Sequence, residues 1–216
     1  ALKYILTVVL KKDWGNKQIP CERGYKTYTN VLSHAQTMKL IEHTDAIAFK
    51  NIFLLMYSSG MRVSEVLNLR IADIDPNRMQ IKIRQSKNGA SRRAILSPKA
   101  LTSLREYFKK HWLKINGTYD PEDFLFFSVR KNTRISSNII GRELKKSLVK
   151  SCIQSKVTCH SLRHGFAVAL MENGVPFNTI AELMGHRSLR STRMYTKLAD
   201  YSKMGIKTPL EYMETE

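Results

Sequence analysis

Arginine, histidine and tyrosine side chains that suit phosphate chemistry gather in three short segments of this 216-residue chain. The segments are GMRVSE at 60–65, HSLRH at 160–164 and LMGHRSLRSTRMY at 183–195. A guanidinium group holds two phosphate oxygens in a bidentate arrangement, so Arg62 and Arg163 together suit a phosphate whose negative charge grows during a reaction. Tyr195 supplies a hydroxyl that becomes a nucleophile once its proton, with an ordinary pKa of about 10, is removed.

In their order and spacing these segments, with the hairpin sequence QSKNGASRR at 85–93, resemble the tyrosine recombinase (phage integrase) family. The resemblance covers about residues 31–200. It places the six catalytic positions of the family on Arg62, Lys87, His160, Arg163, His186 and Tyr195. The chain departs from the family pattern L-G-H in one place, where Met184 separates Leu183 from Gly185.

The resemblance implies a strand-cleaving and rejoining enzyme that forms a 3′-phosphotyrosyl link between DNA and Tyr195. His160 would act as base, and Lys87 would protonate the leaving 5′-oxygen. His186 would donate a hydrogen bond to the phosphate, and Glu65 would support the site. Because the covalent link conserves the bond energy, neither ATP nor any cofactor is expected. No metal ion is expected either, since the motifs contain no cluster of acidic residues that suits Mg²⁺.

Each of these residues taken alone has an ordinary structural explanation. Arg62 and Glu65 have the i,i+3 spacing of a surface ion pair on a helix. Lys87 lies at a turn and His186 follows a helix end, while Tyr195 would suit packing at an interface. Their joint occurrence in the order of one family favours the catalytic interpretation.

Some of these residues could instead belong to a metal site, which is the second interpretation of the sequence. Cys152, Cys159, His160 and His164 are residue types that bind zinc, and the two histidines have i,i+4 spacing. However, the sequence has no C-x₂₋₄-C pair. We therefore expect no metal site, and we expect His164 to pack against the core or the helix start.

Helical periodicity dominates the elements that must position these residues. Ser33 and Gln36 have the spacing of a capping box, and Gly60 suits the residue that ends a helix over 46–59. Further helices are expected at 62–69, 98–114, 136–150, 160–172 and 176–184, and a last short one should carry Tyr195. Phe124, Leu125, Phe126 and Phe127 are expected in the core.

A small antiparallel sheet is expected in the middle of the chain. Apolar and polar residues alternate from Met79 to 84, and the Asn-Gly pair at 88–89 predicts a hairpin whose second strand is 92–96. Residues 71–74 are expected to add a third strand. The fold class is therefore mainly α with a small antiparallel β-sheet (α+β), as the resemblance implies for a tyrosine recombinase catalytic domain.

Composition narrows the class of partner. The formal net charge is +18 and hydrophobic residues make up 43% of the chain, which excludes disorder of the low-hydrophobicity kind. Residues 51–150 carry 20 basic and 8 acidic side chains, which favours double-stranded DNA as the partner. Three cysteines and no apolar run near ~20 residues predict a cytoplasmic protein without a disulfide framework or a membrane partner.

Three regions follow from these patterns. Residues 1–30 are expected to be a linker or N-terminal extension, 31–200 the catalytic domain, and 201–216 a tail that contacts protein. The family's helical core-binding domain is not expected within the chain, and a homo-oligomer, a tetramer on paired DNA sites, is expected. The alternatives to a recombinase are a type IB topoisomerase-like enzyme that relaxes DNA and a non-catalytic DNA-binding protein with the same fold.

Overall fold

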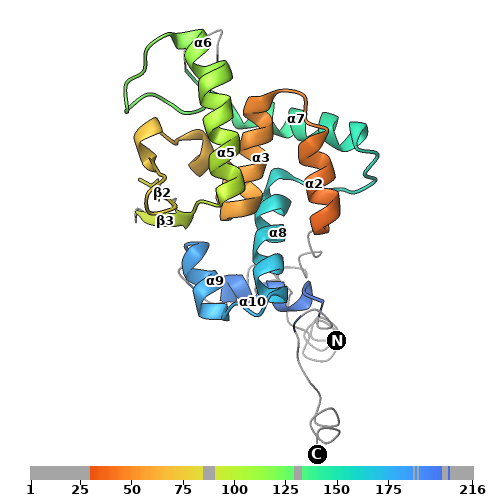
Figure 1. Cartoon of the computed structure of the whole chain (residues 1–216). Helices are drawn as coiled ribbons and strands as arrows, with labels where there is room; N and C mark the ends of the chain where they lie inside the picture. The colour runs from red at the N-terminus through yellow and green to blue at the C-terminus, as the bar shows by residue number, and fades with distance from the viewer. Residues whose placement is uncertain are drawn as a thin grey trace, which may run out of the picture.

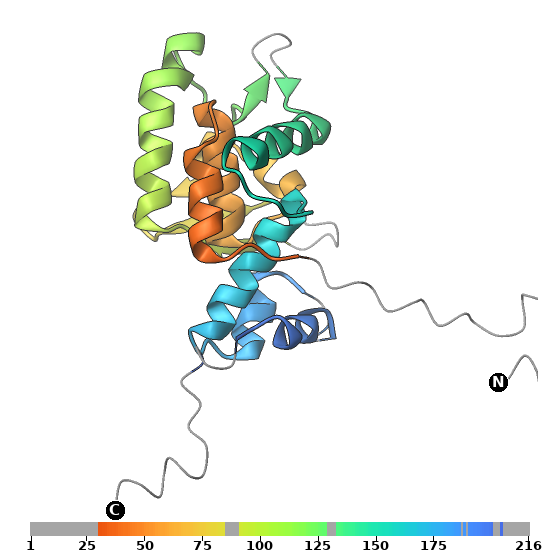
Figure 2. The same ribbon diagram turned by 90° about the vertical axis from the view of Figure 1, so that its right-hand side faces the viewer.

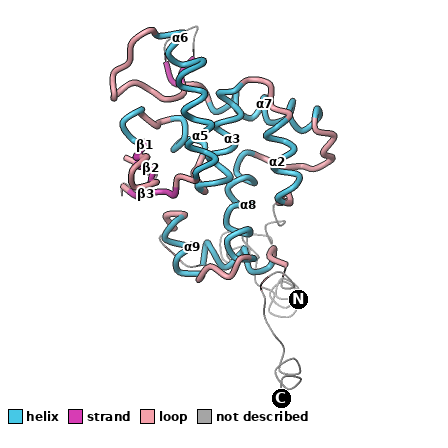
Figure 3. Tube along the Cα trace, in the orientation of Figure 1, coloured by secondary structure: helices cyan, strands magenta, loops and turns pink. Residues whose placement is uncertain are grey.

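The computed structural model describes residues 30–84, 91–128, 133–186, 188, 190–200 and 204. Helices joined by short loops make up most of these ranges, and strands are few (Figures 1 and 3). The longer helices are α2 (His34–Glu42), α3 (Ile47–Ser59), α5 (Pro98–Tyr107), α7 (Ser137–Lys150) and α8 (Cys159–Glu172). The shorter helical elements are α4 (Val63–Leu67), η2 (Ile71–Asp73), η3 (Phe108–Trp112), α6 (Leu113–Asn116), α9 (Phe177–Leu183), α10 (Arg190–Arg193) and η4 (Met194–Lys197).

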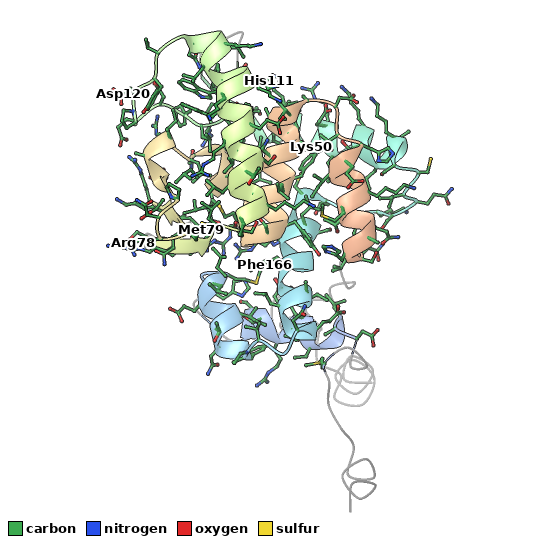
Figure 4. All side chains as sticks on the ribbon, viewed as in Figure 1. Lys50, Arg78, Met79, His111, Asp120 and Phe166 are labelled. Carbon is green, nitrogen blue, oxygen red and sulfur yellow. The ribbon has the colours of Figure 1, made fainter. Side chains whose placement is uncertain are left out.

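The helices form two groups that α8 connects. α2, α3, α5 and α7 lie in the upper group, with α3 in the middle, and α9 and α10 lie in the lower group (Figures 1 and 2). Each group has its own buried apolar core, and Leu162 of α8 belongs to the first core while Phe166 belongs to the second. Phe166 lies where α8 passes from the upper to the lower group (Figure 4). Both cores therefore rest on the helix that carries the HSLRH motif.

Two of the predicted helix ends are confirmed in detail. Ser33 and Gln36 form both hydrogen bonds of a capping box at the start of α2. Gly60 follows α3 with a φ of +62°, the left-handed conformation that a glycine adopts without strain. A Cβ atom on Gly60 would lie 2.3 Å from Cδ1 of Phe166, so glycine also permits the close approach of α3 and α8.

The structure confirms the two strands of the predicted hairpin. β2 (Gln80–Ile83) pairs antiparallel with β3 (Arg92–Ile95), and the two-residue strand β1 (Ile74–Asp75) pairs with the other edge of β2. The prediction of a strand over 71–74 was wrong for 71–73, which form the short helix η2. Met79 was also wrongly assigned to the strand, because its φ of +52° places it in the turn before β2.

Some features had no counterpart in the prediction. A second small sheet pairs β4 (Phe127–Ser128) with β5 (Thr133–Arg134). The helix expected over 98–114 contains one π-helical turn, η3, between α5 and α6. Of the four expected core residues, Leu125 and Phe126 are buried, whereas Phe124 and Phe127 are only half-buried.

Among the helices of the described ranges, none has both the length and the apolar character that crossing a membrane would require.

Candidate active site

The start of α8 presents three of the motif side chains. Thr158 and Ser161 cap this end reciprocally, which fixes where the helix begins. His160, Arg163 and His164 follow at i, i+3 and i+4, the spacing that brings side chains onto one face of a helix. The rings of His160 and His164 are 4.4 Å apart between centroids and nearly perpendicular.

Glu65 connects this helix to the first motif. Arg62 caps the start of α4, where its backbone N–H donates to Oε2 of Glu65 at 2.7 Å and its Nη1 donates to Oε1 at 2.8 Å. Nη1 of Arg163 lies 3.7 Å from Oε2 of the same carboxylate. The ion pair between Arg62 and Glu65 that the spacing suggests is therefore present, but Glu65 is only 4% exposed and the pair belongs to a buried cluster.

The ionisation of Glu65 follows from these contacts. Burial alone would raise the pKa of the Glu65 carboxyl, but the charge of Arg92, the backbone N–H of Arg62 and the charges of Arg163 and Arg62 together lower it. The carboxylate is consequently ionised at neutral pH and holds the surrounding guanidinium groups in place.

Arg163 is fixed by backbone carbonyls from two distant segments. It is 1% exposed, its Nη1 donates to the carbonyl oxygen of Gly60 at 2.6 Å, and its Nη2 donates to the carbonyl oxygen of Met184. Burial, followed by the charge of Arg62, lowers the pKa of Arg163 to about 10, so its charge is retained at neutral pH. Its Nε is buried and has no hydrogen-bond partner among the described residues.

Tyr195 lies in the lower core and is 1% exposed. A hydrogen bond of 2.9 Å joins its hydroxyl oxygen to Nδ1 of His164, and its ring is nearly parallel to that of His186, with centroids 6.3 Å apart. Burial raises the pKa of Tyr195 to about 12, although the charges of Arg163 and Arg62 oppose this rise. The tyrosine is therefore a neutral phenol at rest.

The three histidines of the site are neutral for related reasons. Burial lowers the pKa of His164 and that of His186 to about 4, and the positive charge of Arg163 contributes to both shifts. His160 is exposed, but partial desolvation together with the charges of Arg163 and Arg62 lowers its pKa as well. A hydrogen bond of 2.8 Å joins Nδ1 of His186 to the hydroxyl of Thr192.

The structure thus gathers five of the six predicted residues into one cluster: Arg62, His160, Arg163, His186 and Tyr195. Lys87, the sixth, lies outside the described residues. Two members of the cluster were missed, Arg92 and His164. His164 was expected only to pack, although its i,i+4 spacing from His160 was visible. Arg92 could have been found from the period of β3, which puts it on the same face as the buried Ala94.

The metal interpretation receives no support from this geometry. Within the part of the chain that the structure describes, no three His, Cys, Asp or Glu side chains come together in an arrangement that could hold a metal ion. Cys152 is exposed, and Nδ1 of His164 is engaged by Tyr195.

Comparisons with known proteins agree with this fold and site. The model of the phage integrase family matches residues 30–201. A putative integrase/recombinase y4eF of Sinorhizobium fredii is 30% identical over 99% of this chain and 82% of its own length. The tyrosine recombinase XerA of Pyrococcus furiosus is 34% identical over 85% of this chain, which spans 60% of that relative's length.

Two solved structures extend the comparison. The crystal structure of XerA recombinase matches 99% of this chain and 80% of its own length, with a TM-score of 0.72 and 25% identity. A XerH site-specific recombinase bound to a palindromic difH substrate matches 86% of this chain and 55% of its own length, with a TM-score of 0.72 and 22% identity.

A mainly helical domain with a small antiparallel sheet, two clustered arginines and a tyrosine beside histidines define a catalytic domain of the tyrosine recombinase class. The chain belongs to the phage integrase family, and it is a site-specific recombinase of the tyrosine type.

Proposed function

We propose that this chain cleaves and rejoins double-stranded DNA by transferring a phosphodiester to Tyr195, which leaves a 3′-phosphotyrosyl link and a free 5′-hydroxyl. Attack by the 5′-hydroxyl of a partner strand then releases Tyr195 and exchanges the strands. The observation that carries this proposal is the shared carboxylate of Glu65, which joins Arg62 to Arg163 in the cluster that also holds Tyr195.

The arginines supply the positive charge that the reaction needs. In the transition state the phosphorus is bonded to five oxygens, and these oxygens share about two negative charges. Arg62 and Arg163 carry two positive charges, and the carboxylate of Glu65 that lies between them is also paired with Arg92. The buried Nε of Arg163 is a donor without a partner among the described residues. Because Arg163 is itself only 1% exposed, the site must open before a phosphate oxygen can reach this donor.

The proton of Tyr195 needs an acceptor, because a phenol with a pKa of about 12 is almost fully protonated at neutral pH. The imidazole of His164 is neutral, and its Nδ1 is already within hydrogen-bond distance of the Tyr195 hydroxyl. The adjacent ring of His160 occupies the position that the family resemblance assigns to the base. Proton transfer from Tyr195 to this histidine pair forms the phenolate as the oxygen attacks phosphorus. Lys87 would protonate the leaving oxygen, and His186 would donate to the phosphate.

The buried position of Tyr195 adds a requirement. A side chain that is 1% exposed cannot reach a DNA phosphate, so η4 must shift before attack. DNA binding and assembly of a homo-oligomer, a tetramer on paired sites, would supply the free energy for this shift. We assign the protein to the cytoplasm, where its DNA substrate would lie.

The three predicted regions remain part of this proposal: a linker or extension at 1–30, the catalytic domain at 31–200 and a protein-contacting tail at 201–216. Of the tail, only Met204 is described, and it packs against the lower core of its own chain. Deleting 201–216 is expected to weaken assembly while leaving the affinity of one protomer for a single half-site nearly unchanged.

A nicked suicide duplex with a labelled strand tests the proposed reaction, because the short fragment beyond the cleavage site diffuses away and traps the covalent complex. The wild-type chain should give a covalent band on a denaturing gel, with the DNA attached to Tyr195. Arg163→Ala should lower the rate by about 10²–10³-fold, since it removes charge stabilisation but keeps the nucleophile. Sequencing the trapped DNA would identify the target site.

The same assay addresses the two alternatives. A non-catalytic DNA-binding protein would give no covalent band, and a topoisomerase-like enzyme would relax supercoiled DNA without joining strands of two duplexes. The integrase and recombinase relatives described above favour strand exchange, and nothing in the site favours either alternative.

A further inference from the structure

A third arginine, Arg92, lies in the cluster at the start of β3, and the catalytic set of the family does not include it. Its side chain is 10% exposed. Nη2 donates to Oε2 of Glu65 at 2.8 Å, and Nη1 donates to the carbonyl oxygen of Leu183 at 2.5 Å. One side chain therefore joins three segments that are distant in the sequence: β3, α4 and the end of α9.

The aliphatic part of Arg92 fixes the same region by packing. A Cβ atom on Gly185 would lie 2.6 Å from Cδ of Arg92, and the φ of Gly185 is +61°. Glycine is thus required both by the backbone conformation and by the arginine that fills the space beside it. Because Gly185 directly precedes His186, Arg92 holds the backbone from which His186 projects.

The contact with Glu65 bears on the other two arginines. Oε2 of Glu65 interacts with the backbone N–H of Arg62, with Arg92 and, at 3.7 Å, with Arg163. Among the charges that lower the pKa of Glu65, that of Arg92 has the largest effect. Without Arg92, Glu65 would be shared by Arg62 and Arg163 alone, and both guanidinium groups would be drawn toward the carboxylate.

We propose that Arg92 is a positioning residue for strand cleavage. It acts through Glu65 on the placement of Arg62 and Arg163, and through Leu183 and Gly185 on the segment that leads to His186. This inference rests on the proposed function.

The neighbouring arginine provides a matched control. Arg93 lies on the opposite face of β3, is exposed, and donates from Nη1 to Oε1 of Gln80 at 3.0 Å. It carries the same charge and lies on the same strand, but no hydrogen bond or ion pair to Glu65 or the clustered arginines is described for it. Any effect of lost positive charge near DNA should therefore appear in both arginines, whereas loss of positioning should appear only in Arg92.

The first measurement is the single-turnover rate of covalent-complex formation at saturating suicide duplex, for Arg92→Gln, Arg92→Lys and Arg93→Gln. We expect Arg92→Gln to be slower by about 10²-fold, the scale of a small misplacement of catalytic groups. Arg92→Lys keeps the charge but cannot span both acceptors with one nitrogen, so its rate should be intermediate. Arg93→Gln should stay within about threefold of wild type, as expected for an exposed contact.

The second measurement separates positioning from a general loss of structure. Each variant is combined with Glu65→Gln, and all rates are measured below the melting temperature of every variant. If Arg92 acts through Glu65, the rate of the double variant Arg92→Gln/Glu65→Gln should be close to that of the slower single variant. The losses of Arg93→Gln and Glu65→Gln should multiply. If Arg92→Gln proves too unstable, Arg92→Lys takes its place in the cycle.

A wild-type rate in Arg92→Gln, or losses that multiply fully with those of Glu65→Gln, would overturn the positioning role. Failure of the wild-type chain itself to form a covalent complex would overturn the proposed function instead, so the two failures are distinguishable.

Discussion

Nδ1 of His164 lies 2.9 Å from the hydroxyl oxygen of Tyr195, and this hydrogen bond joins the helix of the HSLRH motif to the short helix η4 that carries Tyr195. His164 is 5% exposed and Tyr195 is 1% exposed. Burial lowers the pKa of His164 to about 4 and raises that of Tyr195 to about 12. Both groups are neutral over the physiological range, so the structure holds the proposed nucleophile in an unreactive form next to its proposed proton acceptor.

Replacing Tyr195 by phenylalanine should abolish covalent-complex formation, because no attacking atom remains. The ring stays, so packing in the lower core is kept, and loss of the hydrogen bond to His164 should lower the free energy of unfolding by about 1 kcal/mol. Urea unfolding and a denaturing gel with the suicide duplex measure the two effects. A covalent band that persists in Tyr195→Phe would show that another residue is the nucleophile.

The neutral state of His164 makes the stability of the protein depend on pH. Its pKa is about 4 in the folded chain, below the ordinary value of 6.5, so the unfolded chain binds more protons between these values. Stability is therefore full above pH 6.5 and is lost as the pH falls toward 4. His164→Gln removes this titration, while the amide oxygen of the glutamine can still accept a hydrogen bond from Tyr195. The variant should therefore lose less unfolding free energy than wild type on acidification, by roughly 1–3 kcal/mol.

Urea unfolding of both proteins at pH 7 and pH 5 provides the measurement. His186, whose pKa is lowered to about the same value, is present in both proteins, so its contribution cancels in the comparison. Equal pH dependence in His164→Gln and wild type would mean that folding does not lower the pKa of His164.

Local sequence rules were sufficient for the elements that depend on neighbouring residues. The capping box at Ser33 and the left-handed residue Gly60 rest on side chains and conformations within one turn of helix, and both are confirmed. Met79 shows the limit of such rules. It fits the alternation of a strand, but it lies in the turn before β2 with a positive φ, and alternation alone does not show at which residue a strand begins.

The sequence predicts those site residues that belong to the ordered motifs of the family. It does not predict the residues that join the site only through a contact between distant segments. Arg92 contacts a carboxylate 27 residues away in the sequence, and His164 contacts a hydroxyl 31 residues away. The sequence around each of them resembles ordinary strand or helix. Only the tertiary contacts of α8 with η4, and of β3 with α4 and α9, give these two side chains their partners.

The basic excess of residues 51–150 should make DNA affinity strongly dependent on salt. If the chain neutralises ~6–10 phosphates, its affinity for a duplex should fall by about 10³–10⁵-fold between ~50 and ~200 mM salt, because counterions are released on binding. Fluorescence anisotropy with a labelled duplex measures this slope. A nearly flat profile would contradict binding through this basic region.

Cleavage should also persist in EDTA, because arginine side chains supply the charge that a metal ion would otherwise provide. The suicide-duplex assay, run with and without the chelator, measures this directly. If EDTA stops the wild-type reaction and added Mg²⁺ restores it, the arginine-based account of charge stabilisation is wrong.

Gly185→Ala should impair the site more than the same change at Gly174. Both glycines have a positive φ, +61° and +73°, so alanine introduces similar backbone strain at each. A Cβ atom at Gly174 meets nothing within 4 Å, whereas one at Gly185 would lie 2.6 Å from Cδ and 2.9 Å from Nε of Arg92. Each variant should lose about 1 kcal/mol of stability or more from strain. Only Gly185→Ala should displace Arg92, and its cleavage rate should fall by about 10²-fold. Thermal unfolding and the single-turnover rate measure the two effects, and equal cleavage rates in the two variants would show that Arg92 can move without consequence for the reaction.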